Sequence, residues 1–221
     1  MKLRNNMKVS ISCDGGAASG KTTGGKLISK KYKLNFLSSG LLYRYASYLL
    51  IKHNPDNKIV FLKKKFKRLN YKKLSKIKLH TEKINSNVSI IAKEKKIRFI
   101  LKKYQLNFAK KFKRICIEGR DISYAILPNA DVKFYFMCNL NTASKRRWGE
   151  LKKVNKKIKL NEVKKSLKIR DFNDKNRKHN PLIKSSDSIV IHSDILNKSK
   201  MVKKMSNILE KKIKKKYGFR N

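Results

Sequence analysis

One short segment near the start of the chain restricts the possible folds more than any other feature. Residues 15–22 read GGAASGKT and match the pattern G-x-x-x-x-G-K-[ST]. The alternating residues 9–13 before the segment predict a strand, and a helix can begin at Lys21 and run toward Tyr32. An ordinary glycine-rich turn is the alternative, but a strand, a loop and a helix in this order are the context that a phosphate-binding loop requires. The segment therefore predicts nucleoside triphosphate binding.

Each residue of this loop has an expected role. Backbone N–H groups at the helix N-terminus surround the β-phosphate, Lys21 reaches the β and γ oxygens, and the Thr22 hydroxyl holds Mg²⁺. Small side chains let the backbone close on the phosphates. We therefore expect triphosphate binding by Gly15, Gly16, Ala17, Ala18, Ser19, Gly20, Lys21 and Thr22, with Thr22 as the metal ligand.

Strands and helices alternate along the rest of the chain, which predicts an α/β fold with a parallel sheet flanked by helices. Residues 58–95 are rich in lysine with poor periodicity, so we expect an excursion outside the core there. We predict strands at 9–13, 34–37, 114–118, 132–137 and 188–191, and helices at 21–32, 41–51, 97–108, 141–154, 163–176 and 199–215.

The charge of the chain is extreme but carries little functional information. Its 59 Lys and Arg against 14 Asp and Glu give a formal net charge of +45. Such a charge ordinarily indicates nucleic acid binding. The lysines, however, occur along nearly the whole sequence, which indicates a composition bias. We therefore expect no specific nucleic acid partner.

Composition and hydropathy indicate a soluble, folded protein. Hydrophobic residues make up 40% of the chain, enough for a buried core. No run of about 18 apolar residues and no secretory signal is seen, so we expect a cytoplasmic protein without a membrane partner. Cys13, Cys116 and Cys138 each stand alone in an apolar run, and we expect all three to be reduced core residues.

Three further segments carry a resemblance to a known family. Residues 38–44 read SSGLLYR, residues 118–121 read EGRD and residues 170–177 read RDFNDKNR. With the loop, they stand in the order of the motifs of bacterial cytidylate kinases, and the chain resembles that family over nearly its whole length. The resemblance implies transfer of the ATP γ-phosphoryl group to CMP or dCMP, with Mg²⁺, in pyrimidine nucleotide metabolism. We expect a monomer.

The resemblance also implies a domain organisation. We expect residues 1–221 to form a single P-loop kinase domain whose core comprises residues 7–52 and 101–215. A nucleotide-binding insert would occupy about 53–100, and a mobile lid about 148–165.

The expected base pocket follows from cytosine chemistry as well as from the resemblance. Cytosine presents an N4 amine donor and an N3 acceptor, so a selective pocket needs a carboxylate and a cationic or hydroxyl donor. Asp121 can supply the first, and Arg98 with Ser89 the second. Ser89 and Arg98 also match the serine and arginine with which the family contacts the ring.

Arginines stand out against the lysine-rich background. A nucleotide phosphate favours planar, bidentate donors, and Arg44 and Arg120 fit that requirement. Asp174 with Ser39 could hold the ribose hydroxyls. A group of catalytic cations would reach the phosphates or the base as the lid closes, and it comprises Arg146, Arg147, Arg170 and Arg177 in addition to Lys21. The resemblance supports these roles without dividing them between Arg170 and Arg177.

Some residues depart from the family pattern. Gly16 stands where proline is usual, Ser38 and Glu118 where aspartate is usual, and Ala143 where an arginine is usual. Glu118 could act as an acidic partner near the metal or cap a loop. The insert is also shorter than is usual in the family.

Three alternatives remain open at this point. The charges of residues 170–177 could form surface pairs worth about 0.2–0.5 kcal/mol each. The acceptor could be another small nucleotide, such as UMP or AMP. The chain could also be a basic P-loop ATPase that binds nucleic acid.

Overall fold

A sheet in the order β2-β3-β1-β4-β5 forms the centre of the fold. The computed structural model describes residues 3–4, 6–153 and 155–218. The central strand β1 pairs in parallel with β3 and β4, and β4 pairs in parallel with β5, which confirms the predicted parallel α/β sheet. The strands are β1 (Val9–Gly15), β2 (Asn35–Ser38), β3 (Arg114–Gly119), β4 (Val132–Met137) and β5 (Ile189–His192).

The register of the sheet brings two polar segments to one edge. Asp14, near the end of β1, pairs with Gly119, the last residue of β3. Because parallel strands end at the same edge of a sheet, the glycine loop after β1 and the Arg120-Asp121 segment after β3 leave that edge side by side.

The chain divides into two units, which we describe separately. The first unit comprises Met1–Leu37 and Phe112–Asn221, and the second comprises Ser38–Lys111. The expected insert at 53–100 lies within the second unit, which also includes residues 38–52 and 101–111. The helices of the first unit are α1 (Lys21–Tyr32), the short η2 (Ile122–Ile126), α6 (Leu140–Lys152), α7 (Leu160–Asn176) and α8 (Lys198–Tyr217).

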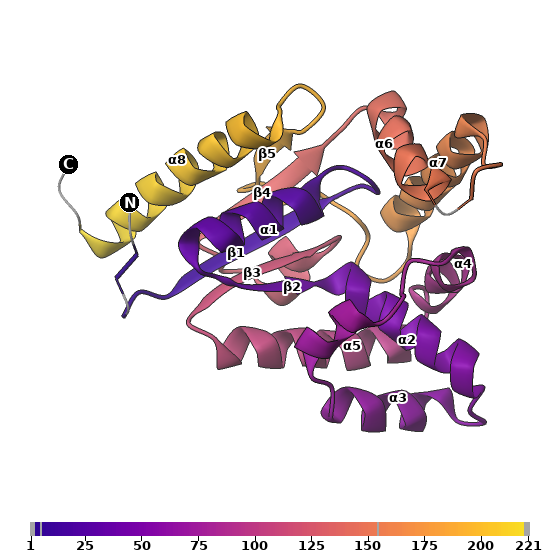
Figure 1. Cartoon of the computed structure of the whole chain (residues 1–221). Coiled ribbons are helices and arrows are strands. Elements are labelled where there is room, and N and C mark those ends of the chain that lie inside the picture. The colour runs from indigo at the N-terminus through magenta and orange to yellow at the C-terminus, as the bar shows by residue number, and fades with distance from the viewer. Residues whose placement is uncertain (1–2, 5, 154, 219–221) are drawn as a thin grey trace. The chain divides into compact units, whose positions relative to one another are not determined.

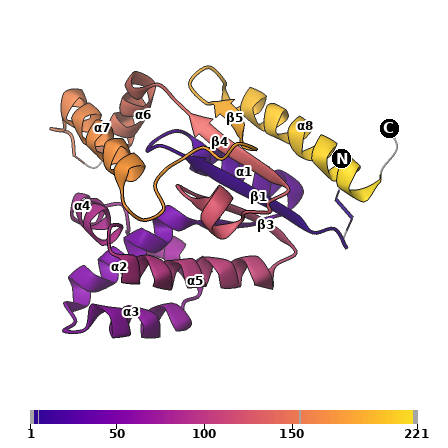
Figure 2. The ribbon, with the colours of Figure 1, turned by 180° about the vertical axis from the view of Figure 1, so that it is seen from behind.

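Helices α1 and α8 lie next to each other on the sheet of the first unit (Figures 1 and 2). Helical spacing explains the faces that they bury: Ile28 and Tyr32 are one turn apart on α1, as are Met205 and Leu209 on α8. These side chains pack with apolar residues of β1 and β4, such as Phe134, in the main hydrophobic core. This core fixes the strand ends from which the polar segments extend.

Helices α6 and α7 pair with each other and against the glycine loop. Ala143, Val163 and Leu167 form a small buried cluster with Ala17 of the loop. Ala143, where the family usually has an arginine, is thus a packing residue. The expected lid at 148–165 spans the end of α6 and the start of α7; Val154, the last residue of the predicted 141–154 helix, lies outside the described residues.

The second unit corrects one expectation about periodicity. Residues 58–95 are largely helical and bury apolar residues at helical spacing, such as Leu62 and Phe66, or Ile84 and Val88. Because α3 and α4 are each only 10 residues long, the periodic signal was short, and in α3 lysines interrupt it. Its helical elements are α2 (Ser39–His53), α3 (Lys58–Lys67), η1 (Tyr71–Lys76), α4 (Glu82–Ile91) and α5 (Lys95–Lys111).

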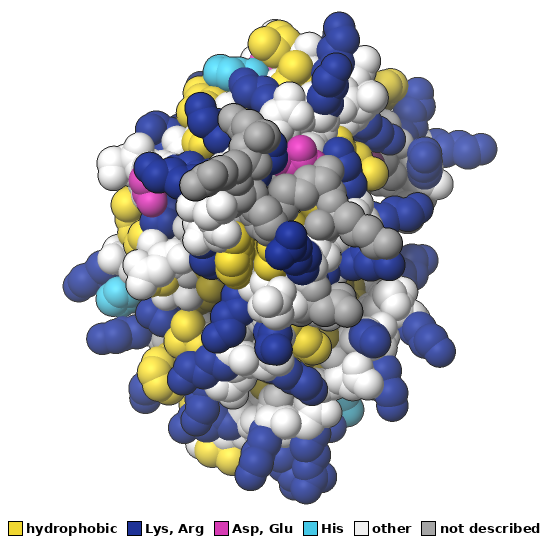
Figure 3. All heavy atoms as spheres, turned by 90° about the vertical axis from the view of Figure 1, so that its left-hand side faces the viewer, with side chains coloured by type: hydrophobic (Ala, Val, Ile, Leu, Met, Phe, Trp, Pro, Cys, Tyr) yellow, Lys and Arg dark blue, Asp and Glu magenta, His cyan; other side chains and the backbone are white. Residues whose placement is uncertain are grey.

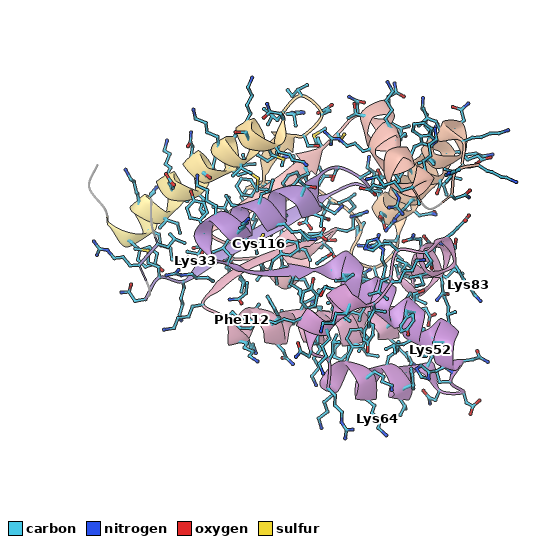
Figure 4. All side chains as sticks on the ribbon, viewed as in Figure 1. Lys33, Lys52, Lys64, Lys83, Phe112 and Cys116 are labelled. Atoms are coloured by element: carbon cyan, nitrogen blue, oxygen red, sulfur yellow. The ribbon has the colours of Figure 1, made fainter. Side chains whose placement is uncertain are left out.

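The lysines are spread over the surface. On the face shown in Figure 3, Lys and Arg side chains alternate with uncharged and apolar atoms and form no single patch. Figure 4 labels Lys52, Lys64 and Lys83, which are exposed and come from α2, α3 and α4 of the second unit. This distribution agrees with a composition bias.

Two of the three cysteines behave as expected. Cys13 and Cys116 are fully buried on the neighbouring strands β1 and β3, with their Sγ atoms 3.8 Å apart as free thiols. Cys138 is also a free thiol, but it is only partly buried because it follows the end of β4. The expectation that all three are core residues is therefore wrong for Cys138.

Candidate active site

The glycine loop joins β1 to α1 as predicted. Gly20 caps the N-terminus of α1 with φ of 79°, a left-handed conformation that favours glycine. The Lys21 side chain is buried, and its Nζ atom donates a hydrogen bond of 2.8 Å to the Gly16 carbonyl. The loop therefore keeps its only lysine folded over its own backbone, in the place where phosphates are expected.

The electrostatic environment of Lys21 favours an anionic ligand. Burial, assisted by the positive charge of Arg120, lowers the pKa of Lys21 to about 7. Glu118 and Asp171 act in the opposite direction but do not outweigh burial. A phosphate group next to Lys21 would supply the negative charge that stabilises its ammonium form.

A buried network of charges connects the Arg120-Asp121 segment with α7. Arg120 Nε lies 2.8 Å from Asp174 Oδ2, and Arg177 lies 3.4 Å from Asp174 and 3.9 Å from Asp121. All four side chains are at most 17% exposed. Burial raises the pKa of Asp174, but the charge of Arg120 and those of two further arginines outweigh it, so the pKa is lowered overall. The alternative of solvent-exposed ion pairs therefore does not describe Asp174 and Arg177, because both are largely buried.

Asp14 was not identified from the sequence, yet it supports this segment. Its carboxylate is fully buried and accepts hydrogen bonds from the backbone N–H groups of Ile122 at 2.9 Å and Ser123 at 2.8 Å. Burial raises the pKa of Asp14 to about 6, although these hydrogen bonds act to lower it. The carboxylate fixes the backbone just after Arg120 and Asp121. A charged residue inside a strand, directly before the glycine loop, was the available signal.

The expected lid arginines have different contacts. Arg146 donates to the Ser193 carbonyl at 2.6 Å and to its hydroxyl at 3.1 Å, and Ser193 Oγ in turn donates to the Ser19 carbonyl of the loop at 2.7 Å. Arg147 instead pairs with Glu150 at 2.8 Å. Arg146 is thus connected to the loop through Ser193, whereas Arg147 pairs within its own helix, and nothing in the sequence around Ser193 indicated its contact.

The second unit holds four of the predicted acceptor residues. Arg44 is oriented by hydrogen bonds of 3.0 Å to Asn85 Oδ1 and to the Gly40 carbonyl. Arg98 lies over the Tyr43 ring, 5.8 Å from its centroid. Two of these partners, Asn85 and Tyr43, were not predicted to matter.

The two serines of the second unit are placed differently. Ser39 is buried and accepts a hydrogen bond of 2.6 Å from Gln105 of α5. Ser89 is half-buried on α4, one turn after Asn85. The expected ribose contact that would combine Ser39 with Asp174 stays a prediction, since the two residues belong to different units.

The residues near the loop fit a magnesium ion bound together with a nucleotide. Across residues 3–4, 6–153 and 155–218, no group of three His, Cys, Asp or Glu side chains forms a ready-made metal cage. Mg²⁺ seldom needs one, because it keeps several waters and takes one or two protein ligands together with substrate phosphates. Thr22, in the first turn of α1, offers a hydroxyl, and Glu118 is a buried carboxylate at the end of β3.

Among the described residues, none of the helices combines the length and the hydropathy that a membrane-spanning segment needs.

Solved structures resemble the fold but not the sequence. An uncharacterized protein from Eubacterium ventriosum superposes with a TM-score of 0.53 at 13% identity, over 92% of this chain and 99% of that one. TT1252 from Thermus thermophilus superposes with a TM-score of 0.50 at 10% identity, over 93% and 98%. At these identities the likeness supports the fold alone.

Sequence comparison goes further than the fold. A family model described as cytidylate kinase matches residues 11–211. A curated protein of Rickettsia akari named cytidylate kinase is 33% identical over 92% of this chain and 92% of its own length. The protein of that name from Rickettsia canadensis is 32% identical over 90% and 91%. With the loop, the Arg120-Asp121 segment and the charges of α7 in place, the chain belongs to the cytidylate kinase family.

Proposed function

We propose that this chain transfers the γ-phosphoryl group of ATP to CMP or dCMP and so forms ADP and CDP or dCDP. The observation that carries the proposal is the closeness of two buried cations at one sheet edge, Lys21 in the loop and Arg120 after β3. The positive charge of Arg120 contributes to the lowered pKa of Lys21, which supports their closeness. The phosphates of ATP and of the acceptor repel each other, and two neighbouring cations would neutralise that charge when the two groups come together.

The chemistry needs alignment more than proton transfer. The attacking group is a phosphate that is already anionic at neutral pH, so no general base is required. Lys21 would lie on the β and γ oxygens of ATP, where it stabilises the charge that spreads over the transferring group. When bound, Mg²⁺ supplies further charge neutralisation on these oxygens, and Thr22 would hold it.

The acceptor would bind along the buried network. Since Asp174 already occupies the Nε side of Arg120, the acceptor phosphate would face the terminal nitrogens of that guanidinium. The Asp121 carboxylate would accept a hydrogen bond from the N4 amine of cytosine. Arg177 would align Asp174 and Asp121, between which it lies. Arg170 would add positive charge, since it already contributes to the lowered pKa of Asp174.

The second unit would complete the acceptor site. We propose that Arg44 contacts the acceptor phosphate, that Arg98 and Ser89 contact the base, and that Ser39 contacts the ribose. The orientation of Arg44 by Asn85 and Gly40 supports its part, because it fixes the plane of the fork.

The lid would exclude water. A mobile segment near residues 148–165 that closes over both nucleotides would prevent loss of ATP by hydrolysis. Arg146 and Arg147 would add cations on closure. The apolar cluster that joins α6, α7 and Ala17 supports a connection between this lid and the loop.

The organisation of the whole protein is part of the proposal. We propose a single kinase domain with the insert and the lid given above, acting as a cytoplasmic monomer in pyrimidine nucleotide metabolism. Family membership supports this assignment.

An ATP-consumption assay with CMP, dCMP, UMP, AMP and GMP tests the function. We expect little turnover without an acceptor and strong stimulation by CMP or dCMP. Stimulation by UMP or AMP instead would assign a different acceptor. Stimulation by RNA or DNA, with steep salt dependence, would favour a nucleic-acid-dependent ATPase and contradict the proposal.

A further inference from the structure

The Gly16–Ala17 peptide group is held from both sides. Its carbonyl oxygen accepts the hydrogen bond of 2.8 Å from Lys21 Nζ, and its N–H group, that of Ala17, donates one of 2.8 Å to Asp171 Oδ1 of α7. A single peptide plane therefore connects the ammonium of the loop with a carboxylate 154 residues away in the sequence. Hydrogen bonds that share one peptide group polarise and strengthen each other.

The loop has a residue without a side chain where the carboxylate approaches. A Cβ atom added at Gly16 would lie 2.6 Å from Asp171 Oδ2, closer than real contacts allow. A side chain at position 16 would therefore displace the Asp171 carboxylate from its present place, so glycine allows this close approach.

The same helix carries residues of the acceptor site. Asp174, one turn after Asp171 on α7, pairs with Arg120, and Arg177 lies next to Asp121. Asp171 itself is half-buried and accepts its hydrogen bond from the glycine loop, and its negative charge also acts to raise the pKa of Arg120. One turn of α7 therefore contacts the glycine loop through Asp171, and the next turn contacts the Arg120-Asp121 segment through Asp174.

We infer that Asp171 is a positioning residue, whose carboxylate orients the Gly16–Ala17 peptide, and with it Lys21, relative to the acceptor residues of α7. The inference rests on the proposed function for the identity of the two substrates. Loss of the contact leaves both binding sites in place but misaligned. Misplacement of reacting groups by about 1 Å can cost on the order of 100-fold in rate.

The experiment is a double-mutant cycle on both sides of the contact. Asp171→Ala removes the acceptor of the Ala17 N–H, and Gly16→Ala pushes the carboxylate away. For each variant we expect kcat to fall by about 10- to 100-fold, with the Kd for ATP alone changed by less than about threefold. The two losses should not add, so the double variant should be about as fast as the slower single variant.

Control variants separate this role from general damage to the helix. Lys175→Ala alters an exposed residue of α7 and should leave kcat unchanged. Asp171→Asn keeps an acceptor oxygen and should be closer to wild type than Asp171→Ala. This order also tests the inference if Asp171→Ala does not fold, since Asp171→Asn can then be combined with Gly16→Ala.

Three outcomes would overturn the inference. Additive losses would mean that the two residues act independently. Tighter ATP binding in Asp171→Ala with kcat retained would mean that the carboxylate merely competes with phosphate for the loop. Unchanged kcat in all variants would remove any role. All rates are measured with the best acceptor of the wild-type panel, so a failure to use CMP is detected in wild type and is not confused with these outcomes.

Discussion

The two units hold their polar residues in different ways. In the first unit, Lys21, Asp14 and Arg120 follow or end strands of one parallel sheet, and their positions are set by the strand register. In the second unit, Arg44 and Arg98 project from helices, and side chains of neighbouring helical residues, Asn85 and Tyr43, help to orient them in addition to backbone carbonyls. Phosphate chemistry thus relies on backbone geometry, whereas the proposed acceptor contacts of the second unit rely on particular side chains. Substitutions should therefore have larger effects in the first unit.

Lys21→Ala should give the largest effect. Removal of the ammonium from the β and γ phosphates should lower turnover by at least about 100-fold while the fold is retained. Steady-state rates and circular dichroism are the measurements. Lys26→Ala, an exposed lysine on the same helix, is the matched control and should be near wild type. If a folded Lys21→Ala variant turns over normally, the loop does not bind the ATP phosphates, and the first unit is not the more sensitive of the two.

Asp121→Asn should change the choice of base. UMP presents an O4 acceptor where CMP presents an amine, and burying two facing acceptors costs on the order of 1–3 kcal/mol, or about ten- to a hundredfold in preference. The amide of the variant can donate a hydrogen bond to O4. The ratio of kcat/KM for CMP to kcat/KM for UMP should therefore be lower in the variant than in wild type. Both substrates are measured at one salt concentration, because so basic a protein binds any nucleotide more tightly at low ionic strength. A constant ratio would remove Asp121 from the base pocket.

Arg44→Lys should have a smaller and more selective effect. The variant keeps the charge but loses the planar fork, so we expect CMP to bind roughly tenfold more weakly, with ATP binding little altered. Isothermal titration with each nucleotide separates the two. Lys52→Ala on the exposed side of α2 provides the control. Equal weakening for both nucleotides would show that Arg44 stabilises the fold.

A proton should be taken up when ATP binds at pH 8. With a pKa of about 7 in the free protein, Lys21 is mostly neutral at pH 8, and the phosphates raise that pKa on binding. ATP affinity should therefore fall as the pH rises through 7, by at most about tenfold per pH unit. Titration calorimetry in buffers of different ionisation enthalpy should detect up to about one proton at pH 8 and little at pH 6. Uptake that persists in Lys21→Ala would assign the proton to another group.

Local patterns predicted much of the first unit. The loop, the strand at 132–137 and the helix beginning at Lys21 follow from short stretches of sequence and agree with the structure. Asp14 is a charged residue near the end of a strand and Asp171 lies in the 170–177 segment, but the partners of both, like that of Ser193, lie far along the chain and cannot be identified from the local sequence.

Residues 58–91 of the second unit were harder to predict because the helices α3 and α4 are short. Lysines fill most exposed positions of α3, and α4 carries mainly Asn, Ser and charged residues between its apolar ones, so only two or three apolar residues mark the buried face of each helix. Asn85 resembles any other surface asparagine in the sequence, and its contact with Arg44 depends on how α2 and α4 pack.

The reactivity of the cysteines on β1 and β3 can be used to measure how often the sheet opens. Cys13 and Cys116 are completely inaccessible, whereas Cys138 is partly exposed, so a thiol reagent should label Cys138 first. The slow labelling of the two buried thiols should then follow the opening of the central strand pair that carries the glycine loop. A nucleotide that binds this loop should slow their labelling and leave that of Cys138 as a comparison, without any change to the sequence.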